Sequence, residues 1–218
     1  MSLHLPTPLI NLITSGSTTS QTTSTSKEFA DVLQLISAAV EARVDLVQVR
    51  EKGLKTHVLF ELTNRAAEIT RGTSTKLLVN DRADVAKAAG ADGVHLTTQS
   101  LPGDVVRHTF GKRFLIGVST HSEEEVFSAR DAGADFVVFG PVFETQSKLL
   151  YGAPRGLHEL ENIAKAAAAF PVVALGGVTI DNAQECVNAG ASGVAAIRMF
   201  SDAQTLPGTV ARLREQMK

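Results

Sequence analysis

The sequence contains no tryptophan, and only 5% of its 218 residues are aromatic. Hydrophobic residues still make up 44% of the chain, so the core must be built mainly from Val, Ile, Leu and Ala. Such a core is typical of parallel strands covered by helices. The length fits one mid-sized domain. We therefore expect a single α/β domain over residues 1–218.

Cysteine, net charge and long apolar runs are also scarce. The single cysteine, Cys186, excludes a disulfide within the chain and suits a reducing compartment. The net charge of −2 creates no overall field that would recruit nucleic acid or an anionic membrane. No segment approaches the roughly 20 apolar residues of a membrane span, and the N-terminus lacks the charged region of a signal peptide. We expect a cytoplasmic protein that acts on small molecules; the sequence leaves its oligomeric state open, a homo-oligomer included.

Four segments repeat one pattern in degraded copies. Each copy ends a helix-like stretch, passes a tight corner and continues into a Val-rich strand. Three of the corners are glycines, as expected where a helix ends in a left-handed residue. The copies are EARVDLVQVR (41–50), AAGADGVHL (88–96), DAGADFVVFG (131–140) and NAGASGVAAI (188–197). Further strands are expected between them, at 8–14, 75–81, 113–119 and 171–177.

The stretches between these strands have helical signals. Thr25 and Glu28 form a capping-box pattern, and the acids at 123–125 favour the start of a helix. Strands that alternate with helices indicate a parallel α/β fold, and eight strands favour a closed barrel over an open sheet of five or six. We predict a (β/α)8 TIM barrel. The Ser/Thr-rich segment 14–26 is interpreted as a flexible loop after the first strand, rather than as a lid.

Active sites of such barrels lie at the C-terminal ends of the strands. In the stretch LVQVREKG, period-2 alternation places Gln48, Arg50 and Lys52 on the face of Leu46. Polar residues and glycines gather at the other strand ends. They are Asn80, Asp81, His95, Thr97, Ser100, Ser119, His121, Thr145, Ser147, Lys148, Gly176, Gly177 and Arg198.

This set predicts a site for phosphate groups. Arg50, Lys52 and Lys148 supply positive charge, and the two adjacent glycines let backbone N–H groups approach a ligand closely. A carboxylate among these cations, Asp81, indicates a divalent metal that bridges phosphate oxygens.

Each element also has a purely structural interpretation. Arg50 and Lys52 could pair with Glu51 or Asp81 at the rim, and Asp81 could instead cap the next helix. His95 could be a hydrogen-bonded core histidine, and His121 a surface residue. The glycine pair could only turn the chain before Thr179 caps a helix, and Arg198 could pair with an acid at the rim.

Seven motifs of the sequence carry a resemblance to a known family. They are VQVREK, LLVNDRADVA, AGADGVHL, IGVSTHS, GADFVVFGPVFETQSK and VVALGGV, followed by AGASGVAAI. Together they resemble the thiamine phosphate synthase family over residues 8–200. That family joins a hydroxymethylpyrimidine diphosphate to a thiazole phosphate and releases diphosphate. The resemblance implies that Gln48, Arg50, Lys52 and Asn80 hold the pyrimidine diphosphate and that Lys148 contacts the leaving group. It further implies Mg²⁺ bound by Asp81, and a hydroxyl contact from Ser119 near the reacting carbon. The contacts implied for the thiazole phosphate are Thr145, Gln146, Ser147, Gly177, Ile197 and Arg198.

Two positions depart from the family pattern. Ser100 stands where the family has a second aspartate for magnesium, and Arg198 where it usually has a small hydroxyl residue. Two alternatives therefore remain. One is an enzyme similar to the thiazole tautomerases of the same superfamily, although some of these carry a catalytic histidine where this chain has Pro141. The other is a non-catalytic barrel that binds phosphorylated thiazole or thiamine phosphate.

Overall fold

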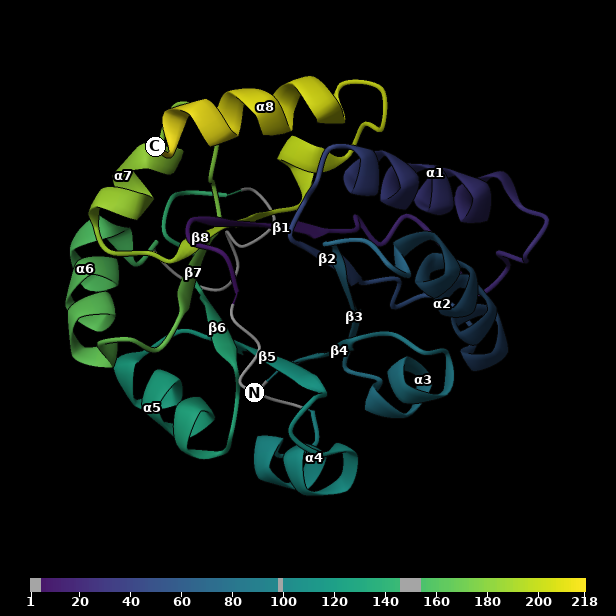
Figure 1. The fold of residues 1–218 in the computed structure, drawn as a ribbon, viewed down its shortest axis with the longest axis horizontal. Helices are drawn as coiled ribbons and strands as arrows, with labels where there is room; N and C mark the ends of the chain where they lie inside the picture. The colour runs from purple at the N-terminus through teal and green to yellow at the C-terminus, as the bar shows by residue number, and fades with distance from the viewer. Residues whose placement is uncertain (1–4, 98–99, 146–153) are drawn as a thin grey trace.

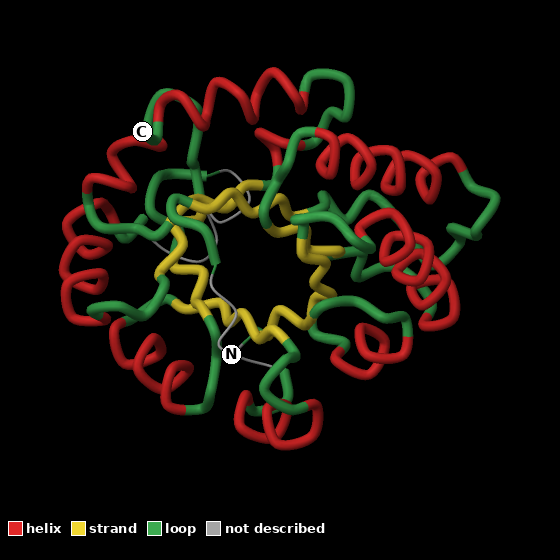
Figure 2. Tube along the Cα trace, in the orientation of Figure 1, coloured by secondary structure: helices red, strands yellow, loops and turns green. Residues whose placement is uncertain are grey.

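The computed structural model describes residues 5–97, 100–145 and 154–218. Its centre is a closed barrel of eight parallel strands in sequential order, β1 to β8, each paired with the next and β8 with β1. The helices form a ring outside the strands (Figure 1). Figure 2 shows this as a yellow inner ring of strands surrounded by red helices. The predicted (β/α)8 barrel is confirmed.

The strands lie where the repeat predicts them, with shorter bounds. They are β1 (Leu9–Ile13), β2 (Leu46–Val49), β3 (Lys76–Asn80), β4 (Gly93–Leu96), β5 (Leu115–Thr120), β6 (Phe136–Phe139), β7 (Val172–Leu175) and β8 (Gly193–Ala196). The helices are α1 (Lys27–Glu41), α2 (Thr56–Thr70), α3 (Ala83–Ala88), α4 (Gly103–Phe110), α5 (Glu123–Asp131), α6 (Gly156–Ala167), α7 (Ala183–Asn188) and α8 (Leu206–Gln216), with a short 3₁₀ turn, η2 (Arg198–Phe200), after β8.

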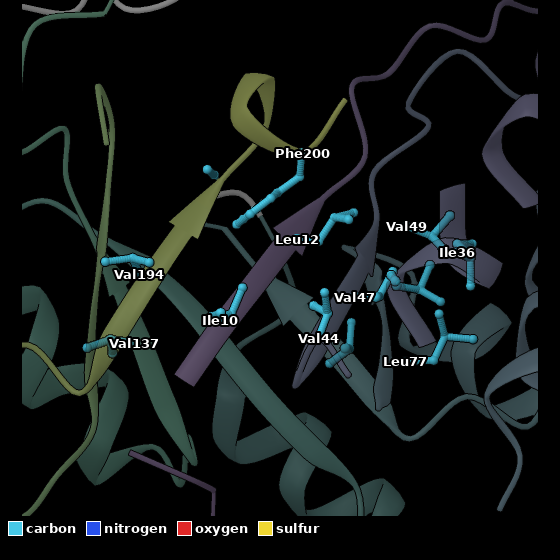
Figure 3. Close-up of a cluster of buried hydrophobic side chains, with 14 of the residues drawn as sticks. Ile10, Leu12, Ile36, Val44, Val47, Val49, Leu77, Val137, Val194 and Phe200 are labelled. Carbon is cyan, nitrogen blue, oxygen red and sulfur yellow. The ribbon is translucent and has the colours of Figure 1, made fainter. Parts of the chain in front are cut away.

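Alternation along each strand separates two apolar clusters. The outer cluster joins one face of the strands to the helices; Val47, Val49 and Ile36 belong to it (Figure 3). The inner cluster consists of residues from the opposite face and fills the barrel; Leu46 belongs to it. Gln48 shares the face of Leu46 and therefore points into the barrel, as the sequence predicts.

Three copies of the repeat carry an aspartate just before the even-numbered strand, and the structure shows its role. Asp45, Asp92 and Asp135 each accept a hydrogen bond from a backbone N–H near the start of the preceding strand, at 2.7, 2.9 and 2.8 Å. Each aspartate also pairs with a cation; the cations are Arg214, Lys76 and Arg107. The fourth copy has Ser192 at this position, and no such side-chain bond is found there in the described residues. These strand-start aspartates therefore close the N-terminal end of the barrel, away from the polar strand ends.

The tight corners of the repeat are left-handed, as predicted. Arg43, Gly90, Gly133 and Gly190 have φ values of 56°, 76°, 85° and 90°. The expected helix start at Thr25 is wrong, because α1 begins after Ser26, whose side chain makes no capping bond. The Ser26 hydroxyl instead accepts from the N–H of Thr23.

The segment 14–26 has defined contacts in the structure. The carboxylate of Glu51, which is only 2% exposed, accepts hydrogen bonds from the N–H of Gly16 and from the N–H and hydroxyl of Thr18. Thr18 and Thr22 are buried. The segment therefore packs against the turn after β2, beside Arg50. None of the helices in the described parts of the chain is long and apolar enough to cross a membrane.

Candidate active site

The end of β2 brings three polar side chains to the mouth of the barrel. Gln48 is buried on the inner face, Arg50 is half-buried, and Lys52 is exposed in the turn that follows. The N–H of Arg50 donates to the hydroxyl of Thr14 at 2.8 Å, which joins the ends of β1 and β2. Neither cation forms an ion pair with Glu51 or Asp81, both of which are described. The rim-pairing interpretation is therefore wrong, and the positive charge of Arg50 and Lys52 is available to a ligand.

The adjacent strand, β3, ends in Asn80, and Asp81 follows it directly. Asp81 is exposed and has a left-handed backbone, with φ of 64°. Its N–H donates to the carbonyl of His95 on β4 at 2.8 Å. Arg82, not Asp81, occupies the N-cap position of α3, so the capping interpretation is wrong. The carboxylate of Asp81 forms no hydrogen bond or ion pair with the described residues and can accept a ligand.

His95 and Ser119 meet on neighbouring strands. His95 is 2% exposed, and its Nε2 lies 2.9 Å from the Ser119 hydroxyl. Burial, assisted by the positive charge of Arg50, lowers the pKa of His95 to about 4. The imidazole is therefore neutral near pH 7, and the interaction with Arg50 indicates that the guanidinium lies near this pair.

The turn after β4 contains Ser100. The Ser100 hydroxyl accepts a hydrogen bond from the N–H of Thr97 at 2.7 Å and lies 3.2 Å from the Thr97 hydroxyl. The side chain thus closes this turn, although Ser100 occupies the position that the resemblance associates with a metal ligand. Directly after β5, the ring Nδ1 of His121 bonds to the carbonyl of Gly140, which fits a structural role for this histidine.

The ends of β6 and β7 touch through a glycine. Gly177 has a left-handed backbone, with φ of 65°, and a Cβ atom there would lie 2.5 Å from the carbonyl oxygen of Glu144. The glycine is thus required for the close packing of the residues that precede Thr145. Asn182 directly precedes α7, and Thr179 forms a reciprocal capping pair with it: the Thr179 hydroxyl accepts from the N–H of Asn182, and the Asn182 Oδ1 accepts from the N–H of Thr179. The interpretation of Thr179 as a residue that caps the start of this helical segment is therefore supported.

Arg198 lies at the end of β8, beside Ile197. Its guanidinium donates to the hydroxyl of Thr145 at 2.8 Å. Arg198 is exposed, and it forms no ion pair with a described acid. The alternative interpretation of Arg198, a salt bridge at the rim, is therefore not found in the described residues. Three other predicted site residues, Gln146, Ser147 and Lys148, lie outside the described residues.

Comparison with known proteins identifies the family of this chain. The family model described as thiamine monophosphate synthase matches residues 20–200. This chain belongs to that family. A putative thiamine-phosphate synthase of Geobacter sulfurreducens is 44% identical over 77% of this chain and 78% of its own length. The thiamine-phosphate synthase of Moorella thermoacetica is 38% identical over 84% of this chain and 87% of its own.

A solved structure supports the same family at the level of the fold. The thiamine phosphate pyrophosphorylase of Pyrococcus furiosus superposes with a TM-score of 0.80 and 28% identity, covering 96% of this chain and 95% of that one. The similarity of fold thus extends beyond the residues 20–200 that the family model matches.

The described residues allow a test of whether this synthase-family barrel can hold magnesium. No group of three or more His, Cys, Asp or Glu side chains that could bind a metal is found among them. Asp81 is nevertheless an unpaired carboxylate at the mouth. Magnesium is commonly held by one or two protein carboxylates, with substrate phosphates and water as the remaining ligands. The residues present fit a magnesium ion that depends on its substrate.

Two contacts of the site are not evident from the sequence. Glu51 is expected there only as an ion partner of Arg50 or Lys52, whereas in the structure it binds the loop after β1. For His95 the sequence indicates a hydrogen-bonded core histidine but not its partner, Ser119. Period-2 parity of β4 and β5 places both side chains on the inner face, and this signal could have paired them.

Proposed function

We propose that the mouth of this barrel joins a hydroxymethylpyrimidine diphosphate to a thiazole phosphate and forms thiamine phosphate. One observation carries the proposal: Arg50, Asp81 and Ser119 lie at the C-terminal ends of β2, β3 and β5, in a chain that belongs to the family. Chains named for this synthesis match most of the sequence.

The reaction begins with cleavage of the bond between the pyrimidinylmethyl carbon and the bridging oxygen of the diphosphate. The electron pair leaves with the diphosphate, and the thiazole nitrogen then donates its lone pair to the carbon. Such a step needs stabilisation of the leaving group and an oriented nucleophile, not a strong base. Arg50 and Lys52, together with Lys148, supply the positive charge for the diphosphate, while Gln48 and Asn80 hold the pyrimidine.

Asp81 would bind magnesium together with diphosphate oxygens. The ion supplies positive charge to the leaving group. Because the Ser100 hydroxyl is neutral and engaged with Thr97, Asp81 would be the only carboxylate that the described residues offer to the ion, which would then depend on substrate phosphates and water.

The other half of the mouth, formed by β6, β7 and β8, would bind the thiazole phosphate. Arg198 and Thr145 are already joined by a hydrogen bond, and a guanidinium fits a phosphate through two parallel N–H groups. Ile197 shares the inner face and can contact the thiazole ring. Gln146 and Ser147 follow Thr145 directly and complete this set, together with the backbone of Gly177. A cytoplasmic location is also part of the proposal, since the free thiol of Cys186 suits a reducing compartment.

An assay with both substrates tests the proposal. Purified protein, magnesium, the pyrimidine diphosphate and the thiazole phosphate should yield thiamine phosphate and diphosphate in equal amounts. Isomerisation of a thiazole without diphosphate release would instead favour the tautomerase function. Tight binding of either ligand without any turnover would favour a non-catalytic barrel.

A further inference from the structure

The inner face of β4 and β5 is built around the imidazole of His95. A Cβ atom on Gly117, which pairs with His95 in the barrel, would lie 2.8 Å from Nδ1 of the ring. The ring of Phe136 packs on the imidazole, with centroids 6.2 Å apart and planes tilted by 46°. The bare glycine and the phenylalanine together fix the ring, and Nε2 then faces Ser119 at 2.9 Å.

The two ring nitrogens have different environments. Nε2 contacts the Ser119 hydroxyl, whereas Nδ1 is buried and has no hydrogen-bond partner among the described residues. Among backbone groups, a buried N–H without a partner is rarer than a buried acceptor without one, and we extend this rule to the imidazole nitrogens. The neutral ring therefore carries its proton on Nε2, and Nδ1 keeps its lone pair.

This tautomer determines the direction of the serine hydroxyl. If Nε2–H donates to Oγ of Ser119, the serine cannot donate its own hydrogen back to the ring, and that O–H is free to point toward the mouth. Hydrogen bonds in a chain polarise one another, so the serine becomes a stronger donor. Arg50 lies nearby and is also a donor. Both donors, the Ser119 hydroxyl and the Arg50 guanidinium, can stabilise an oxygen atom that gains negative charge.

We propose that His95 is a positioning residue that donates from Nε2 to Ser119 and fixes the serine hydroxyl as a donor to the bridging oxygen of the departing diphosphate. The proposal rests on the proposed function for the identity of the oxygen. No proton is transferred: the carbon–oxygen bond breaks, the oxygen keeps the electron pair, and the serine hydrogen bond strengthens as charge develops.

Kinetics of four proteins test the role: His95→Phe, Ser119→Ala, the double variant and wild type. His95→Phe should lower kcat about tenfold, which corresponds to one hydrogen bond of about 1.4 kcal/mol, with KM for both substrates within about twofold. In the Ser119→Ala background the same change should have less than about a threefold effect, because His95 acts through the serine. His95→Gln, whose amide can still donate, should restore most of kcat. His108→Gln, on the exposed face of α4, is the matched control.

Nitrogen-15 NMR of the histidine rings in the wild-type protein tests the tautomer independently of activity. The His95 signal, assigned by its loss in His95→Gln, should show the proton on Nε2. A proton on Nδ1, or a kcat loss from His95→Phe that is equal with and without Ser119, would overturn the proposal. Absence of synthase turnover in the wild type would refute the proposed function, and the NMR result would still decide the hydrogen-bond arrangement.

Discussion

The carboxylate of Glu51 binds Thr18 twice, through the backbone N–H at 3.1 Å and the hydroxyl at 2.7 Å, although 33 residues separate them in the chain. A third bond, from the N–H of Gly16, is 3.2 Å long. The loop after β1 is therefore attached beside Arg50, whose own N–H donates to Thr14. The position of this cation thus depends on the loop.

Replacement of Glu51 should loosen this attachment. Glu51→Ala removes all three bonds and leaves the N–H and hydroxyl of the buried Thr18 without this partner, so the free energy of unfolding should fall by about 2–3 kcal/mol. Urea unfolding measures this loss, and limited proteolysis within 14–26 should become faster. Thr18→Val, which removes only the hydroxyl, should cost about 1 kcal/mol. Unchanged proteolysis in Glu51→Ala would contradict a role of this residue in holding the loop.

The diphosphate site should depend on charge. Arg50→Met and Lys148→Ala should each lower kcat/KM roughly ten- to a hundredfold, since a charge-assisted hydrogen bond contributes about 1.5–3 kcal/mol. Diphosphate release measures the rate. Arg71→Met is the matched control, because Arg71 is an exposed arginine at the C-terminal end of α2. Near wild-type rates in both Arg50→Met and Lys148→Ala would refute the assignment.

Gly177 should tolerate no side chain. Gly177→Ala would place a methyl group 2.5 Å from the carbonyl of Glu144 and so displace Thr145. We expect KM for the thiazole phosphate to rise far more than KM for the pyrimidine diphosphate. Gly72→Ala is the control for backbone strain. Gly72 also has a left-handed backbone, with φ of 77°, but a Cβ atom there would meet nothing within 4 Å, so this variant has the strain without the steric clash. Equal increases in both KM values would show that Gly177 does not act on the thiazole side.

Magnesium dependence should reflect the single carboxylate. Ser100→Asp adds a charge near the proposed ion and should lower the half-saturating magnesium concentration about tenfold, or about 1.4 kcal/mol. The aspartate can still accept from the N–H of Thr97, so the turn should persist. Ser100→Asn, which has the same shape without the charge, should leave the midpoint unchanged. A magnesium titration of the three proteins makes the comparison, and identical midpoints would show that residue 100 does not face the ion.

Stability should fall in acid because of His95. Its pKa is lowered to about 4 in the folded protein by burial and by Arg50, whereas the unfolded chain takes up this proton near pH ~6.5. The stabilisation from the neutral ring is therefore complete above pH ~6.5 and is lost as the pH falls toward about 4, by roughly 3 kcal/mol. Urea unfolding should be measured for wild type and His95→Gln between pH ~6.5 and about 4. The difference between their free energies of unfolding should change by roughly 3 kcal/mol across this range. A constant difference would contradict the lowered pKa.

Much of the fold is predictable because the sequence repeats it. In the copies that end in VDLVQVR and ADFVVFG, one pattern predicts the tight corner, the strand that follows it and which strand residues point inward. A single pattern therefore locates several elements. The inward direction of Gln48 follows from the same alternation. Helix starts are less predictable: Thr25 and Glu28 have the right spacing for a capping box, yet Ser26 precedes the helix, because the hydroxyls of this Ser/Thr-rich segment bond to one another and to nearby backbone groups.

The site is predictable as a set of residues but not as a set of contacts. Alternation shows that Arg50 faces the mouth, but it cannot show that Glu51, pointing the other way, binds a loop 33 residues earlier. Likewise the bond between Arg198 and Thr145 joins residues 53 positions apart, and only closure of the barrel brings them together.

Mutations at the strand-start aspartates should affect stability, whereas mutations at the mouth of the barrel should affect catalysis. Asp45, Asp92 and Asp135 lie at one end of the barrel and the polar mouth at the other, so a random library should yield two populations of inactive clones. Substitutions at these aspartates should give proteins that melt early but regain activity on cooling or with stabilising osmolytes. Substitutions at Arg50 or Asp81 should give proteins that melt normally and that no osmolyte rescues. Ser192 occupies the same position in the fourth copy of the repeat but makes no such side-chain bond in the described residues, so substitutions at Ser192 should appear in neither population.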